Sequence, residues 1–159
     1  MSQKCHADII LVAYRGYSDS EGKPSQKGLE KDSEAILTYA IDYKQNKKSD
    51  IDIFVMGRSL GGAVTFHIAS KKFYSTHIKG IIVENTFTSI ADMVDAIMPI
   101  FKLLKVLITN PWRSIDRVPE ISQPILFIKC LRDELVPPSH MNSLIKNAGN
   151  SKYVEVYEI

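Results

Sequence analysis

A serine between two glycines is the first place in this sequence where residue types and spacing point to chemistry. Gly57-Arg58-Ser59-Leu60-Gly61 follows a run rich in β-branched residues and precedes an apolar stretch. This is the G-x-S-x-G pattern of a nucleophile elbow, in which a tight turn between a strand and a helix holds a serine hydroxyl above a sheet. Glycine is expected two residues before and two residues after the serine, because side chains there would collide. The pattern predicts that Ser59 is a nucleophile.

The residue after the serine has a predicted role of its own. The N–H of Leu60, at the start of a helix, is expected to donate to the oxyanion of a tetrahedral intermediate. The alternative interpretation is a glycine-rich turn made only for packing. A phosphate-binding loop is disfavoured, because this segment lacks the Gly-Lys-Ser/Thr ending of that motif.

A serine nucleophile also needs a carboxylate and a histidine later in the chain. Asp133 is the candidate acid, because it lies in the loop that directly follows a predicted strand at residues 124–129. Glu134 and Asp116 compete for this role, but Glu134 lies one residue further into the loop and Asp116 follows no predicted strand. The alternative role for Asp133 is that of an exposed loop carboxylate or a helix cap.

The elements that must position these residues are apolar strands that alternate with helices. Four apolar runs lack clean polar alternation, which is typical of strands covered on both faces, and a fifth, shorter run alternates as an edge strand would. The predicted strands are residues 7–14, 51–56, 78–84, 124–129 and 153–157. The predicted helices are residues 25–43, 60–72, 89–108 (interrupted by Pro99) and 138–148.

The strict succession of strand and helix predicts one α/β domain over residues 1–159, with a mostly parallel, doubly wound sheet of about five strands. Ligands and catalytic groups of such sheets lie beyond the C-terminal ends of the strands. Arg15 and Glu84 follow predicted strands and are expected there, either as groups that support the elbow or in a structural salt bridge with Arg58 or with each other. His6 and His77 precede strands and are expected at the opposite end.

The composition excludes several classes of protein. With 159 residues, of which 45% are hydrophobic and 24% charged, the chain fits one globular domain and not a disordered segment. Lys and Arg number 20 against 18 Asp and Glu and form no block, so no nucleic-acid partner is expected. Cys5 and Cys130 are far apart and no metal-ligand spacing is present, which predicts reduced thiols and neither a metal nor another cofactor. The absence of a signal-peptide pattern or a bilayer-spanning segment favours a cytoplasmic or membrane-associated location.

Four segments in a fixed order carry a resemblance that covers almost the whole chain. YRGYSDSEG at residues 14–22, GRSLGG at 57–62, ENTF at 84–87 and DELVPPSHM at 133–141 resemble the Bem-like branch of the α/β-hydrolase superfamily. The resemblance implies a serine hydrolase related to depalmitoylases and monoacylglycerol lipase-like enzymes, acting on a small-molecule or acylated-protein ester or thioester. By it, Ser59 matches the nucleophile and Asp133 the acid. The sequence departs at Ala13, where Asp is usual, and at Ser18, where Gly is usual.

The largest departure concerns the catalytic histidine, which in this family follows the last strand in a short Gly-x-His-Asn segment. The chain ends at Ile159, and only six residues precede Ala7, where the family has its first strands and the His-Gly loop that supplies a second oxyanion amide. The resemblance therefore predicts a chain truncated at both ends. His67 lies roughly 12 Å along the predicted helix from Ser59, which is beyond hydrogen-bonding reach. His140 matches a non-catalytic position of the family and is expected to be a surface or capping residue.

A serine hydrolase that acts through an acyl-enzyme on Ser59 is the leading prediction. One alternative is a catalytically inactive fragment that acts as a binding module, because no histidine is available as the base. A peptidase on the same fold is another, since a triad does not distinguish amides from esters.

A cap is predicted over residues 89–112. An apolar stripe at helical spacing would line an acyl pocket, make peripheral contact with a membrane, or cover the edge of the sheet. Trp112 would anchor the return of the chain to the core. The stripe is formed by Ile97, Phe101, Leu104 and Ile108.

Overall fold

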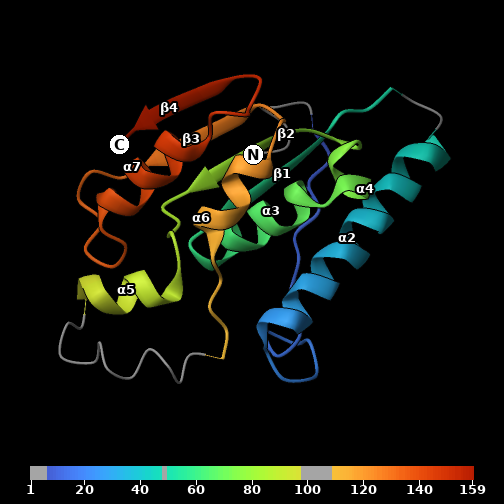
Figure 1. The fold of residues 1–159 in the computed structure, drawn as a ribbon. Helices are drawn as coiled ribbons and strands as arrows, with labels where there is room; N and C mark the ends of the chain where they lie inside the picture. Colours follow the sequence, from blue (N-terminus) through green and yellow to red (C-terminus); the bar gives the residue numbers. More distant parts are fainter. Residues whose placement is uncertain (1–6, 48–49, 98–108) are drawn as a thin grey trace.

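Four parallel strands form the sheet of this protein (Figure 1). The computed structural model describes residues 7–47, 50–97 and 109–159. The strands are β1 (Ile53–Arg58), β2 (Ile78–Glu84), β3 (Ile125–Lys129) and β4 (Val154–Glu158), and their order in the sheet is their order in the chain. Each lies within two residues of its predicted bounds, because runs of branched and aromatic side chains form strands wherever a neighbouring strand is available.

Helices alternate with the strands as predicted. They are α2 (Gln26–Lys47), α3 (Leu60–Ser70), α4 (Lys72–Ser75), α5 (Ile90–Ile97), α6 (Ser114–Arg117), the 3₁₀ turn η2 (Val118–Glu120) and α7 (Pro138–Asn147). The helix predicted for residues 60–72 ends at Ser70, and α4 follows after one extended residue. Of the predicted cap helix, α5 is present, and the part of the apolar stripe at Phe101, Leu104 and Ile108 lies outside the described residues. No helix in the described parts of the chain is both long and apolar enough to cross a bilayer.

The main core lies between the sheet and the helices α2, α3 and α7. Phe66 of α3, Phe127 of β3 and Leu144 of α7 are fully buried in it, and the rings of Phe66 and Phe127 are 6.4 Å apart. Phe54 and Met56 of β1 point to the opposite face and remain 60% and 49% exposed. Strands covered on both faces were expected, and for β1 that expectation is wrong.

Residues 7–14 do not form the predicted strand, so the described sheet has four strands and not five. A strand needs a neighbour to pair its backbone N–H and C=O groups. Here a groove of about 750 Å³, lined by this segment, α2 and β1, separates residues 7–14 from the edge of the sheet. Apolar side chains such as Leu11, which is 91% exposed, therefore remain in contact with solvent.

A second buried cluster fastens the connecting segments to the start of α3. Trp112 is 4% exposed and packs with Leu29 of α2, Val64 of α3, Phe87 and Val136. Trp112 is thus buried in the core of the protein, as its predicted role as an anchor requires.

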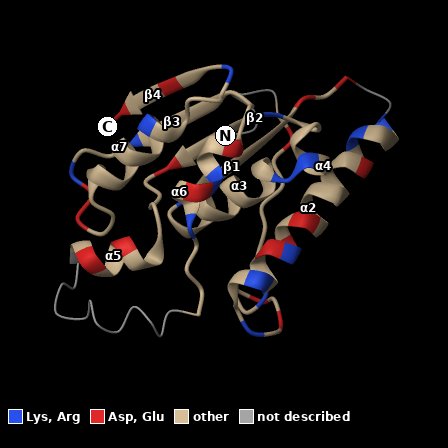
Figure 2. Cartoon of the chain, viewed as in Figure 1, with Lys and Arg blue, Asp and Glu red and all other residues tan. Residues whose placement is uncertain are grey.

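A network of ion pairs joins α2, α3 and α6. Figure 2 marks the acidic residues along α2 and the charged residues at α6. His67 is buried between Glu30, Glu34 and Arg117, with its Nδ1 3.3 Å from a Glu30 oxygen and its Nε2 3.4 Å from a Glu34 oxygen. The guanidinium of Arg117 contacts the His67 ring and also donates to Glu30 at 2.6 Å. Burial lowers the pKa of His67, and the charge of Arg117 lowers it further. In the folded protein, His67 is therefore held toward its neutral form.

Candidate active site

Ser59 occupies the turn between β1 and α3 in a strained backbone conformation, with φ of 51° and ψ of −119°. A non-glycine residue at such angles costs about 1–3 kcal/mol and persists only where its surroundings hold it. The N–H of Ser59 donates to the carbonyl of Glu84 at 2.9 Å, and the N–H of Gly62 donates to the carbonyl of Ser59 at 3.0 Å. The strand, sharp turn and helix predicted for this segment are all present.

The glycines of the turn have different steric roles. A Cβ on Gly57 would lie 2.1 Å from the carbonyl oxygen of Gly61, so the turn closes only with glycine at position 57. A Cβ on Gly62 would lie 2.5 Å from Cβ of Thr86, which imposes the same requirement. A Cβ on Gly61 would meet no atom within 4 Å. The expected collision is therefore present at Gly57 and absent at Gly61, which contributes its backbone to the close contact.

Leu60 is the first residue of α3, so its N–H belongs to the unpaired amides at the start of a helix. Its side chain packs against the buried cluster around Trp112, which fixes the position of this amide. Within the described residues the Leu60 N–H has no hydrogen-bond acceptor. A free amide at the positive end of a helix is suited to stabilising negative charge that develops beside Ser59.

The basic and acidic residues around the elbow form two separate pairs. Arg58 Nε lies 3.4 Å from a carboxylate oxygen of Glu84, which is the structural salt bridge considered from the sequence. Arg15 contacts neither of them. Its side-chain and backbone N–H groups instead donate to the carboxylate of Asp32, on α2, at 2.6–3.0 Å. These hydrogen bonds from Arg15 hold the pKa of Asp32 below its usual value. Arg15 thus attaches the segment after residue 14 to α2, at a distance from the elbow.

Asp133 lies in the loop after β3 and is half-buried. One of its carboxylate oxygens accepts the N–H groups of Leu135 and Val136, both at 2.9 Å, which fixes the carboxylate in the loop. Ser59 follows β1 and Asp133 follows β3, with one strand between them in a parallel sheet. Adjacent strands are about 4.8 Å apart, so the two residues belong to the same edge of the sheet at a lateral separation of roughly 10 Å. That separation leaves room for an imidazole.

The competing carboxylates are placed less well for this role. Asp116 lies on α6 in an ion pair with Arg113, and Glu134 is exposed.

None of the described histidines lies between Ser59 and Asp133. His67 is held in the charge network of α2, α3 and α6. His77 precedes β2, at the opposite end of the sheet. His140 is 5% exposed, which corrects its expected place on the surface.

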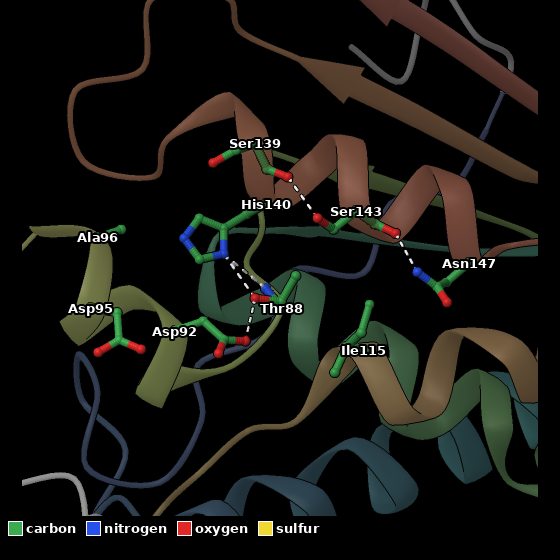
Figure 3. A pocket seen from close by; sticks show the side chains of 9 residues that line it. All are labelled: Thr88, Asp92, Asp95, Ala96, Ile115, Ser139, His140, Ser143 and Asn147. Atoms are coloured by element: carbon green, nitrogen blue, oxygen red, sulfur yellow. Dashed lines mark hydrogen bonds between the residues drawn. The ribbon is translucent and has the colours of Figure 1, made fainter. Parts of the chain in front are cut away.

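His140 lines a polar pocket between α5 and α7 (Figure 3). Its Nδ1 lies 2.9 Å from the hydroxyl of Thr88, and that hydroxyl donates to Asp92 at 2.6 Å. Burial lowers the pKa of His140, and the nearby Asp92 carboxylate partly opposes this. Ser59 does not line this pocket, so His140 supports the α5–α7 contact and not the elbow.

The described residues contain no group of three or more His, Cys, Asp or Glu side chains able to hold a metal ion. Cys130 is a free, half-buried thiol, and Cys5 lies outside the described residues.

Comparison with known proteins finds sequences similar to this chain, although no family model matches it. The sequence is 40% identical over 164 residues to the alpha/beta hydrolase domain-containing protein WAV2 of Arabidopsis thaliana, and 35% identical over 147 residues to the protein bem46 of Schizosaccharomyces pombe. Over almost its whole length, the chain is therefore similar to Bem46-like members of the α/β-hydrolase superfamily. The matches cover 94% and 91% of this Bem46-like chain but 51% and 48% of the two relatives, so the chain spans about half their length.

Solved structures show the same fold. An esterase of Pyrococcus furiosus superposes with a TM-score of 0.68 at 20% identity, over 91% of the Bem46-like chain and 58% of the esterase. The predicted α/β-hydrolase fold is therefore confirmed.

Several residues of the site were not predicted. Asp32 accepts hydrogen bonds from Arg15 although the two residues are 17 positions apart in the chain. The charge of Asp32 was the only signal in the sequence for this contact. The hydroxyl of Thr86 donates to the Ser59 carbonyl at 2.8 Å, and the side chain of Asn85 accepts the N–H of Cys130 at 2.8 Å. Thr86 and Asn85 belong to the ENTF segment, whose placement directly after a strand was the available signal.

Proposed function

We propose that this chain carries the nucleophile and the acid of a serine hydrolase that cleaves the ester or thioester of an acyl or lipid-like substrate. The strained conformation of Ser59, at the end of a strand and the start of a helix, is the observation that supports this most. The half-buried Asp133 on the same edge of the sheet, and the likeness to an esterase, agree with it.

The proposed reaction proceeds through an acyl-enzyme. Ser59 Oγ attacks the carbonyl carbon of the substrate while a histidine base takes its proton, and the N–H of Leu60 donates to the oxyanion that forms. Collapse of this intermediate breaks the bond to the alcohol or thiol, which leaves with the proton from the histidine. Water then attacks the acyl-enzyme, which releases the carboxylic acid and restores Ser59. Asp133 orients the histidine and stabilises its positive charge.

In this mechanism the histidine comes from outside the described residues, because His67 and His140 are bound elsewhere and His77 lies at the opposite end of the sheet. The same observation favours a second candidate function, a catalytically inactive binding module built on this fold. The hydrolase and the binding module differ in the reactivity of Ser59, because an elbow without a base leaves the serine hydroxyl a poor nucleophile.

Labelling with a fluorophosphonate probe separates them. The intact product of the gene and the 159-residue chain are each treated with the probe, and the tryptic peptide that begins at Ser59, after Arg58, is examined by mass spectrometry. Ser59→Ala serves as the matched control. We expect labelling of Ser59 in the intact product and none in the variant.

The outcomes are distinct. Labelling of the intact product alone shows that the base lies outside this chain. If Ser59 of the intact product stays unlabelled while a known serine hydrolase in the same tube reacts, the hydrolase proposal is refuted and the binding module is favoured.

A further inference from the structure

The turn after β2 contacts both sides of the candidate active site. The carbonyl of Glu84 accepts the N–H of Ser59 at 2.9 Å, and two residues later the hydroxyl of Thr86 donates to the carbonyl of Ser59 at 2.8 Å. Both backbone polar groups of the strained serine are therefore bound by one short segment.

Thr86 is a rigid support. Its side chain is fully buried, and its N–H faces Met141 Sδ of α7 at 3.4 Å. It packs so closely on α3 that a Cβ at Gly62 would lie 2.5 Å from it. Since the residue is shielded from water, no solvent molecule replaces its hydroxyl at the Ser59 carbonyl.

Asn85 contacts the other side of the candidate active site, where β3 leads into the loop that contains Asp133. It has a positive φ of 42°, its N–H donates to the carbonyl of Ile128 at 3.1 Å, and its side-chain oxygen accepts the N–H of Cys130 at 2.8 Å. Cys130 begins the loop that contains Asp133. Asn85 is 7% exposed, so this contact is also shielded from solvent.

We propose that Asn85 and Thr86 are positioning residues that fix the distance between the serine turn and the Asp133 loop. This inference rests on the proposed function, in which one imidazole must reach both Ser59 and Asp133. Reacting groups misplaced by 1 Å lose roughly 100-fold in rate. A single turn that binds the backbone on both sides removes the independent motion of the two loops.

Hydrogen–deuterium exchange on the intact gene product tests the positioning without relying on activity. Thr86→Val removes only the donor, and Thr86→Ser keeps it. We expect Thr86→Val to speed exchange in residues 57–62 at least tenfold while the β3 and β4 amides stay within twofold of wild type, and Thr86→Ser to remain within threefold. Thr38→Val is the matched control, since the exposed Thr38 hydroxyl also donates to a backbone carbonyl, that of Glu34.

A second pair of variants tests the acid side independently. Asn85→Gly keeps the positive φ but removes the acceptor, and Asn85→Asp keeps an acceptor. We expect Asn85→Gly to speed exchange at least tenfold in residues 130–136, and Asn85→Asp to leave it near wild type. This pair decides the proposal if Thr86→Val fails to fold.

The rate of fluorophosphonate labelling at Ser59 gives the functional readout. We expect a loss of tenfold or more in Thr86→Val that Thr86→Ser restores. An unlabelled wild type would refute the hydrolase but leave the exchange experiment valid. Exchange that rises uniformly over the protein, or a Thr86→Val profile equal to that of Thr38→Val, would overturn the positioning role.

Discussion

Replacing Gly57 with alanine is the sharpest test of the elbow. In the present backbone the new Cβ would lie 2.1 Å from the carbonyl oxygen of Gly61, 2.3 Å from its carbonyl carbon and 2.5 Å from Thr65 Oγ1. Two of these atoms are backbone at the start of α3 and cannot rotate away. The methyl group therefore forces β1 and α3 apart by roughly 1 Å, in a region packed to normal protein density.

The expected cost follows from that displacement. Overpacking a well-packed site costs about 1–3 kcal/mol and occasionally more, and a clash with backbone places Gly57→Ala near the upper end. For a protein of this size, a loss of about 3 kcal/mol lowers Tm by roughly 6–12 °C. Gly61→Ala is the matched control, because its Cβ meets nothing within 4 Å. We expect it to change the free energy of unfolding by less than about 1 kcal/mol, as alanine also favours the helix.

Urea unfolding followed by tryptophan fluorescence measures both variants. Trp112 is the only tryptophan of the sequence and is buried in the cluster that touches Leu60, so its emission reports on this region. Equal midpoints for Gly57→Ala and Gly61→Ala would refute the steric account of the elbow.

Two further predictions concern stability. The buried histidines His67 and His140 have lowered pKa values, so the unfolded chain binds more protons below about pH 6.5 and the free energy of unfolding should fall as the pH drops from there. His67→Asn should reduce the change in the free energy of unfolding with pH by up to about 1.4 kcal/mol per pH unit, measured in urea titrations between pH 5 and 7. An unchanged pH dependence would contradict a buried, neutral His67. Phe127→Ala should lower the free energy of unfolding by about 3–5 kcal/mol because the ring is fully buried. Phe54→Ala, at a 60% exposed site, should lower it much less. Similar losses for the two variants in urea unfolding would show that the core is misassigned.

The sequence predicted the elements that depend on local pattern. β2 matches its predicted bounds because its four β-branched residues favour a strand and both neighbouring strands are present. Residues 7–14 have an equally strong pattern but form no strand, since pairing depends on a neighbour that a local pattern does not describe. The candidate nucleophile could be identified because the G-x-S-x-G pattern that marks it lies in five adjacent residues. The partners of Arg15 and of the Ser59 carbonyl come from distant parts of the chain, and their contacts depend on packing.

The matching order of strands in the chain and in the sheet has a consequence for how the protein is made. At about 5–20 residues per second, the roughly 100 residues from β1 to β4 leave the ribosome over some 5–20 s. Each new strand can join the edge left by the strand before it, so the sheet can grow in one direction during synthesis. Ser59 is made before the turn at Glu84–Thr86 that binds its backbone. The contacts that hold the strained serine are thus completed only once β2 has joined β1, which is the first pairing of the described sheet.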